Sequence, residues 1–261
     1  MAVEATAGDG TQHHITVRDL TMAFGSFVLM RDLNFTIDHG DVFIVMGGSG
    51  SGKSTLLRHM IGLTEPARGE ILYEAQNFTR SSALARQQIL RRVGVMFQGG
   101  ALWSALTLAE NVGLLLEEYT DLSPAEIRDV ASLKLALVGL KGFEDYYPSQ
   151  ISGGMQKRAG LARAMALDPE ILFFDEPSAG LDPISARLLD ELILELRDSL
   201  GTTVVVVTHD LASIFTIGDN SVFLDAGSRT ITASGPPKEL RAHTQDSTLR
   251  SFLTRGGTEN P

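Results

Sequence analysis

A glycine-rich loop between residues 47 and 55, with the sequence GGSGSGKST, constrains this chain more than any other stretch. It fits the pattern G-x-x-x-x-G-K-[ST]. Glycines let a backbone curl so that successive N–H groups point at one anion. In such a loop the lysine reaches the outer phosphates of a nucleotide, and the serine hydroxyl ligates Mg²⁺. The pattern therefore predicts a phosphate cradle made of Gly47, Gly48, Ser49, Gly50, Ser51, Gly52, Lys53, Ser54 and Thr55.

The residues on either side of the loop favour a strand–loop–helix unit. Residues 41–46 are mostly apolar, as in a buried strand. After the loop, Leu56 and Met60 are four residues apart, as are Leu57 and Ile61, which is the spacing of one helix face. The alternative is a flexible Gly/Ser-rich loop that matches by chance. The flanking pattern favours the cradle, because a helix N-terminus presents free N–H groups and partial positive charge to an anion.

The composition limits the class of protein. The length of 261 residues allows one large domain or two small ones, and 43% hydrophobic residues are enough for a core. The chain has no cysteine, which excludes disulfides. A net charge of -10 argues against a nucleic-acid partner, because proteins that bind nucleic acids generally have basic surfaces. No apolar run approaches the roughly 20 residues that span a bilayer. Residues 1–13 are polar, and we expect a disordered tail there rather than a signal peptide.

Strand and helix patterns alternate along the chain, which predicts an α/β fold with helices on both faces of a sheet. The strand candidates are 15–17, 33–37, 70–73, 93–97, 171–174, 203–208, 222–224 and 230–232. The helix candidates are 81–92, 124–138, 152–167 and a long helix in which Leu188, Leu192, Leu196 and Leu200 mark the apolar face. Ser123, Pro124 and Glu126 predict a capping box at a helix start.

These patterns imply one domain over residues 14–254 with a polar tail at 255–261. The block 103–165 is mostly helical and lies between predicted sheet strands. We interpret it as a helical subdomain inserted into a core made of residues 14–102 and 166–254.

Two carboxylates follow the apolar run 171–174, at the end of a predicted strand where α/β sheets bind ligands. Asp175 is a candidate ligand for Mg²⁺, and Glu176 is a candidate general base for an attacking water. The alternative is a solvated strand end. His209 and Gln98 also follow predicted strands, and each taken alone is equally an ordinary loop residue. Their significance depends on several strand ends meeting at one edge.

The chain resembles the ABC-type ATPases from about residue 15 to 240. The motifs that carry the resemblance, in family order, are Gly47–Ser54, Gln98, Ser152-Gly153-Gly154, Asp175-Glu176, Ser178–Asp182 and His209. The resemblance implies the P-loop NTPase fold: a RecA-like mixed sheet, an antiparallel β subdomain and an inserted helical subdomain. It also implies ATP and Mg²⁺ as cofactors and hydrolysis that uses Lys53, Glu176 and His209.

The resemblance assigns further roles by position. Phe24 is similar to the aromatic residue that stacks on adenine, although an ordinary core phenylalanine is the alternative. Gln98 resembles the residue that senses Mg²⁺ and couples to a membrane partner. Ser54 and Asp175 resemble the other residues that hold Mg²⁺. Ser152, Gly153 and Gly154 resemble the signature that closes over ATP bound by a second copy, and Asp182 belongs to the loop that joins the two sites. The chain departs from the family at Gly48, Ile151 and Met155, where Pro, Leu and Gln are usual.

Residues 97–103 and 152–158 are similar to the subfamily that serves MCE-protein phospholipid transporters of the Mla type. That implies a homodimer at the cytoplasmic face of the bacterial inner membrane, peripheral to a separate permease, with an MCE-type lipid-binding protein and a small accessory subunit as further partners. Four apolar residues are candidates for contact with the permease or for core packing: Ala101, Leu102, Trp103 and Leu106. The alternatives are an ATPase of a small-solute importer, a soluble non-transport ABC protein, and a non-catalytic nucleotide-binding regulator.

Overall fold

The computed structural model describes residues 13–254. The predicted tails, except for His13, lie outside the described residues. His13 itself contacts the Asp38 carboxylate through Nδ1. Within 13–254, no helix is long and apolar enough to cross a membrane.

A six-stranded sheet forms the centre of the molecule, in the order β10-β9-β3-β8-β7-β6. Its strands are β3 (Val42–Gly47), β6 (Val93–Met96), β7 (Ile171–Asp175), β8 (Thr203–Val207), β9 (Asn220–Asp225) and β10 (Thr230–Ser234). All pair in parallel except β9 and β10, which form the predicted hairpin. Every residue of β3, β7 and β8 is buried, because a parallel sheet is covered on both faces.

The register brings the predicted site residues to one edge of this sheet. Val207 of β8 pairs with Val45 of β3 on one side and with Asp175 of β7 on the other. The carboxyl ends of the three strands therefore lie level, and the loops that follow them converge. This is the position where open α/β sheets bind ligands.

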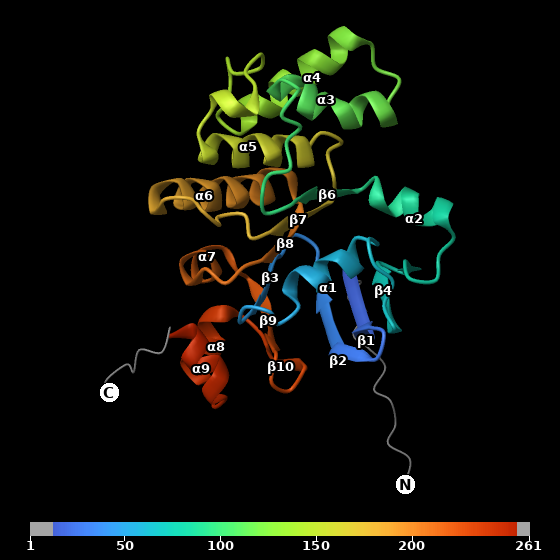
Figure 1. Cartoon of the computed structure of the whole chain (residues 1–261), viewed down its shortest axis with the longest axis vertical. Helices are drawn as coiled ribbons and strands as arrows, with labels where there is room; N and C mark the ends of the chain where they lie inside the picture. Colours follow the sequence, from blue (N-terminus) through green and yellow to red (C-terminus); the bar gives the residue numbers. More distant parts are fainter. Residues whose placement is uncertain (1–12, 255–261) are drawn as a thin grey trace.

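A second sheet is antiparallel, in the order β2-β1-β4-β5. Its strands are β1 (Ile15–Phe24), β2 (Phe27–Ile37), β4 (Arg68–Tyr73) and β5 (Gln76–Asn77). The sheet packs on the face of the central sheet that also carries α1 (Lys53–Met60), as Figure 1 shows in blue. Phe35 of β2 stacks on Phe43 of β3, with ring centroids 5.5 Å apart.

Helices alone occupy the chain between β6 and β7. They are α3 (Leu108–Tyr119), α4 (Pro124–Leu137), the short 3₁₀ helix η1 (Pro148–Gln150) and α5 (Gly153–Ala164). Helices α3, α4 and α5 gather at one end of the molecule (Figure 1). The predicted start of α4 is confirmed, because Ser123 and Glu126 form a reciprocal capping box with Pro124 in the first turn. Thr107 and Glu110 cap α3 in the same way.

The remaining helices are α2 (Ala83–Leu90), α6 (Pro183–Leu200), α7 (Leu211–Ile217), α8 (Pro237–His243) and α9 (Ser247–Leu253). The predicted apolar face of α6 is wrong at its ends. Leu188 is 54% exposed and Leu200 is 53% exposed, whereas Leu189 and Ile193 are buried. A spacing of four residues overshoots the 3.6-residue turn by about 40° each time, so a run of such leucines leaves the buried face.

Candidate nucleotide site

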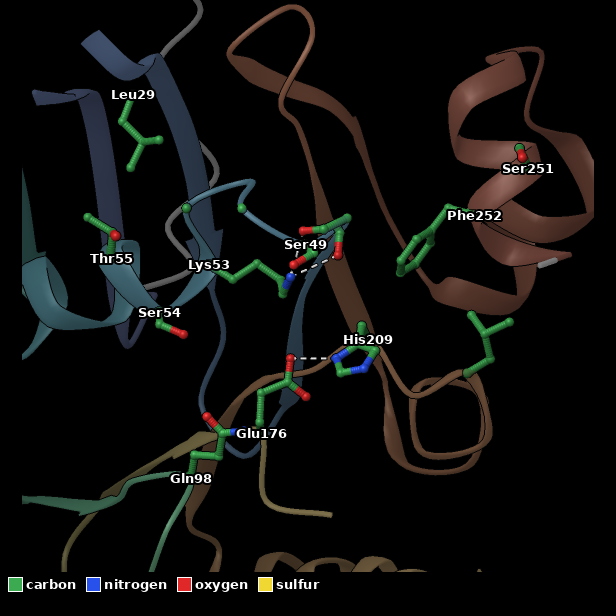
Figure 2. Close-up of a pocket in the computed structure, with 15 residues that line it drawn as sticks. Leu29, Ser49, Lys53, Ser54, Thr55, Gln98, Glu176, His209, Ser251 and Phe252 are labelled. Carbon is green, nitrogen blue, oxygen red and sulfur yellow. Dashed lines mark hydrogen bonds and ion pairs between the residues drawn. The ribbon is translucent and has the colours of Figure 1, made fainter. Parts of the chain in front are cut away.

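The loops at the carboxyl edge of the central sheet enclose a cavity of about 910 Å³. The predicted residues that line it are Gly47, Gly48, Ser49, Gly50, Gly52, Lys53, Ser54, Thr55, Gln98, Glu176 and His209. Figure 2 shows the lysine, the glutamate and the histidine around this cavity, on segments that follow three different strands. Of the predicted cradle, Ser51 is buried and does not line the cavity.

The backbone of the loop requires glycine at two of the fixed positions. Gly47 has φ +153° and Gly52 has φ +88°, in a region that other L-residues rarely adopt. A Cβ atom on Gly47 would lie 2.5 Å from the Leu224 carbonyl oxygen. The helix α1 begins directly after Gly52, at Lys53, so its free N–H groups are at the cavity. The loop therefore has the form of an anion cradle.

Lys53 supplies the positive charge of the cradle. Its Nζ donates to the carbonyl oxygens of Gly47 and Gly48, each at 2.9 Å, and the residue is 8% exposed. Burial lowers the pKa of Lys53, and the nearby carboxylates of Glu176 and Asp175 oppose that shift. The ammonium is thus held at the loop by neutral carbonyls, which leaves its charge available to a phosphate.

Ser54 and Asp175 place two oxygen ligands together. The Ser54 hydroxyl donates to Asp175 Oδ1 over 2.8 Å, and Asp175 is 8% exposed. A hydroxyl and a carboxylate are the hard oxygen donors that Mg²⁺ prefers. The donor set therefore fits the cation that the sequence predicts here.

Glu176 and His209 form a pair on the opposite wall from the glycine-rich loop (Figure 2). His209 Nδ1 lies 2.7 Å from Glu176 Oε1. Glu176 has φ +49°, and its N–H donates to the Val207 carbonyl over 2.8 Å. At this left-handed residue the backbone leaves the extended conformation of β7, and the Glu176 side chain lines the cavity. A carboxylate so placed can accept a proton from a water beside a bound phosphate.

Gln98 lines the cavity two residues after the end of β6, and α5 holds the loop that begins at Gln98. Lys157 Nζ donates to the Gln98 carbonyl. Arg163 donates to the carbonyls of Ala101 and Gly100, at 2.5 and 3.1 Å. Burial lowers the pKa of both basic side chains. That α5 fixes this loop is not predictable from the sequence, because the partners are backbone carbonyls far away in the chain.

The signature residues lie apart from the cavity, at the N-termini of two neighbouring helices. Ser152 caps α5 by accepting from the Met155 N–H over 3.3 Å. Asp182 caps α6 by accepting from the N–H groups of Ile184 and Ser185, each at 3.0 Å. The two ends are adjacent, since a Cβ on Gly154 would lie 3.3 Å from Ser185 Oγ. Ser152, Gly153, Gly154 and Asp182 therefore form a second group that does not line the cavity of the same chain.

Phe24 is also outside the cavity lining. It ends β1 and is 55% exposed, so it is not a core phenylalanine. The structure adds four lining residues that the sequence did not indicate: Leu29, Leu211, Ser251 and Phe252. Phe252 of α9 points toward the cavity (Figure 2) and packs on Phe223, with centroids 5.3 Å apart. Only tertiary packing brings this C-terminal helix to the glycine-rich loop.

Comparisons with known proteins agree with this site. The family model described as ABC transporter matches residues 30–179. The intermembrane phospholipid transport system ATP-binding protein MlaF of Haemophilus influenzae is 37% identical over 96% of this chain and 93% of its own length. The probable ribonucleotide transport ATP-binding protein mkl of Mycobacterium tuberculosis is 40% identical over 92% of this chain, which spans 66% of that protein.

A solved structure has the same fold. The dimeric ATP-binding cassette MJ0796, in a post-hydrolysis state with ADP and phosphate, superposes with a TM-score of 0.76 at 30% identity, over 84% of this chain and 97% of that one. The family match covers the glycine-rich loop, the signature and the Asp175-Glu176 pair. The chain therefore belongs to the ABC transporter family of ATP-binding proteins, and its site is one for ATP hydrolysis.

Proposed function

We propose that this chain is the ATP-hydrolysing subunit of a bacterial transporter that moves phospholipids between membranes. The observation that carries the proposal is the match to MlaF of Haemophilus influenzae, which extends over nearly the full length of both chains. A small-solute transporter is the second candidate. It is supported by the similarity to mkl, a protein named for ribonucleotide transport, of which this chain spans 66%.

In the proposed hydrolysis, the glycine-rich loop and Lys53 bind the phosphates of ATP. Glu176, positioned by His209, accepts the proton of the attacking water. Ser54, Gln98 and Asp175 would hold Mg²⁺, which neutralises phosphate charge when it is bound. Phe24, exposed at the end of β1, would stack on the adenine.

A second copy of the chain would complete each site. Ser152, Gly153, Gly154 and Asp182 lie away from the cavity on exposed helix N-termini, and such N-termini favour anions. We propose that they face the ATP held by the partner copy. The dimeric state of the MJ0796 cassette supports this arrangement.

We propose that the transporter's permease docks on the loop that follows Gln98. Trp103 is 64% exposed there, which disfavours core packing as its role. The buried Asn111 fixes the loop: its amide accepts from the Trp103 N–H over 2.7 Å and donates to the carbonyls of Trp103, Leu106 and Thr107. Lys157 and Arg163 bind the same loop to α5, whose N-terminus carries the signature residues. Movement of α5 would therefore move the loop on which the permease docks.

This arrangement fits the division into a core of residues 14–102 and 166–254 and a helical subdomain of 103–165, which we retain as part of the proposal. We also propose that the chain lies peripherally at the cytoplasmic face of the inner membrane. An MCE-type lipid-binding protein and a small accessory subunit would be further members of the complex.

Isolation of the native complex tests the lipid assignment. The chain, tagged at its chromosomal locus, is extracted from membranes in mild detergent, and its protein partners and bound lipids are identified by mass spectrometry. We expect a permease, an MCE-type protein and phospholipid. The Trp103→Asp variant should lose the permease, whereas Leu84→Asp, at an exposed leucine on α2, should keep it. Recovery of a solute-binding protein without phospholipid would instead favour the second candidate.

A further inference from the structure

A group of metal-ligating side chains lies where the antiparallel sheet meets the central sheet, away from the nucleotide cavity. His14 directly precedes β1, His39 lies in the turn between β2 and β3, and Glu74 lies in the turn between β4 and β5. Backbone hydrogen bonds hold them together: His14 N–H donates to the Ile37 carbonyl at 2.9 Å, and Glu74 N–H donates to the His14 carbonyl at 2.8 Å. Their ligand atoms all lie within 4.8 Å of one another.

The imidazole of His14 is oriented as a metal ligand is. Its side chain is 5% exposed, and its Nδ1 lies 2.7 Å from Thr203 Oγ1 on β8. The Thr203 hydroxyl can donate or accept, and it also accepts from the Gly40 N–H over 2.9 Å. A ring fixed through one nitrogen in this way presents the other to a cation.

His14 is buried beside charged and aromatic groups. Burial, and then the charges of His39 and Arg92, lower the pKa of His14 to about 4. Its neighbour His39 is exposed and stacks on it, with ring centroids 3.9 Å apart and an interplanar angle of 16°.

The carboxylates around His14 differ in how firmly they are paired. His14 Nε2 lies 3.8 Å from Glu170 Oε2, beyond hydrogen-bond distance. Arg92 lies 3.1 Å from Glu170 and 3.7 Å from Glu74, so Glu74 is the less tightly paired of the two. One guanidinium therefore serves two carboxylates, those of Glu74 and Glu170. A cavity of about 500 Å³, lined by His14, His39 and Glu170 among others, adjoins them and leaves room for water.

We propose that His14, His39 and Glu74 bind a divalent transition metal of the zinc class, with water completing its coordination. Two imidazoles and a carboxylate are a typical ligand set for Zn²⁺. A metal lies in the plane of each imidazole that binds it, so His39 has to leave its stack on His14 for both rings to share one ion. His39 is exposed and Glu74 is half-buried, so burial does not hold either side chain in place. Bound metal would join the antiparallel sheet to β8 through His14 and Thr203, and so clamp the two sheets.

Titration with Co²⁺ and Zn²⁺ tests the site in the full chain, freed of any tag and treated with chelator. Co²⁺ gives a visible absorption band that reports nitrogen and oxygen ligands, and Zn²⁺ should displace it. We expect His39→Ala and Glu74→Gln to weaken binding at least tenfold, about the effect of disturbing a metal's ligand shell. Both residues are on turns, so the variants should fold. His243→Ala, at an exposed histidine on α8, is the matched control and should bind as the parent does.

The nucleotide site offers a rival pair of ligands, so His209→Ala is measured alongside. Binding that survives His209→Ala and fails in His39→Ala supports the proposed site. Binding that fails in His209→Ala and survives in His39→Ala overturns it, as does the absence of any binding in the parent chain. Thermal unfolding gives an independent reading: Zn²⁺ should raise the Tm of the parent and of His243→Ala, and leave that of His39→Ala unchanged.

Discussion

His209 Nδ1 lies 2.7 Å from Glu176 Oε1, while the two side chains differ greatly in exposure: the imidazole is 65% exposed and the carboxylate 13%. The histidine thus holds the carboxylate from the open side of the cavity. Since His209 follows β8 and Glu176 follows β7, their contact depends on the parallel register of those two strands. The pair therefore joins Glu176, the proposed base, to the loop that follows β8.

Replacing Glu176 with glutamine should separate ATP binding from hydrolysis. An amide keeps the shape and the contact with His209 and cannot accept a proton, so turnover should fall by about 100-fold or more. The bound ATP should then hold two copies together, which size-exclusion chromatography with ATP would detect as a dimer. Glu195→Gln, on the exposed face of α6, is the control and should hydrolyse ATP normally. Full activity in Glu176→Gln would remove Glu176 as the base.

Replacing Lys53 with alanine should abolish turnover by a different route. The loop would lose the ammonium that Gly47 and Gly48 hold at the cavity, so ATP should bind weakly as well as react slowly. Equilibrium binding of a fluorescent ATP analogue and phosphate release measure the two effects separately. Lys141→Ala, at an exposed lysine beyond α4, should be indistinguishable from the parent. Near-normal hydrolysis by Lys53→Ala would contradict the assignment of the loop.

The features that could be predicted from the sequence depend on residues that are close together in the chain. The cap of α4 was predicted correctly, because Ser123 and Glu126 are three residues apart and determine each other. The glycine-rich loop was equally predictable, since its φ angles demand glycine at fixed spacing. The predicted apolar face of α6 is wrong at Leu188, because leucines spaced four residues apart stay on one helix face only over a short run.

Contacts between residues that are far apart in the chain could not be predicted from the sequence. Nothing in the sequence around Phe252 indicates that α9 lines the nucleotide cavity, or that Lys157 and Arg163 hold the loop after Gln98. These side chains contact backbone carbonyls or other side chains, and the sequence does not indicate which of them lie close together in the fold. The sequence motifs predicted most of the residues that line the cavity, whereas Leu29, Leu211, Ser251 and Phe252 were not predicted.

Replacing Asn111 with alanine should loosen the loop on which the permease is proposed to dock. The buried amide makes four hydrogen bonds to backbone groups of that loop. Their removal takes the side-chain partner from the Trp103 N–H and the Leu106 carbonyl, while the Trp103 and Thr107 carbonyls keep a backbone donor. Loss of such a buried group costs about 1–3 kcal/mol of the free energy of unfolding. Urea unfolding would measure this loss, and hydrogen exchange should rise at residues 103–107. Asn77→Ala, at a half-buried asparagine of β5, tests whether any asparagine has this effect on the loop.

Replacing Asp190 with asparagine should stabilise the protein at neutral pH. Asp190 is 4% exposed, its Oδ2 accepts from Ser213 over 2.8 Å, and its Oδ1 has no hydrogen-bond partner among the described residues. Burial, reinforced by the charge of Asp210 and opposed by the Ser213 hydrogen bond, raises the pKa of Asp190 to about 6. Between pH 4 and 6 the folded state therefore binds more protons than the unfolded state, so this group lowers stability as pH rises.

The neutral asparagine lacks that penalty. Asp190→Asn should exceed the parent in free energy of unfolding by about 1–3 kcal/mol at pH 7.5, and the difference should shrink toward zero near pH 4. Urea unfolding across this range measures the difference, in which the titration of other groups, including His14, cancels. Asp129→Asn, at an exposed aspartate of α4, should show no such trend. A parent more stable than Asp190→Asn at pH 7.5 would mean that Asp190 is charged and stabilised by its surroundings.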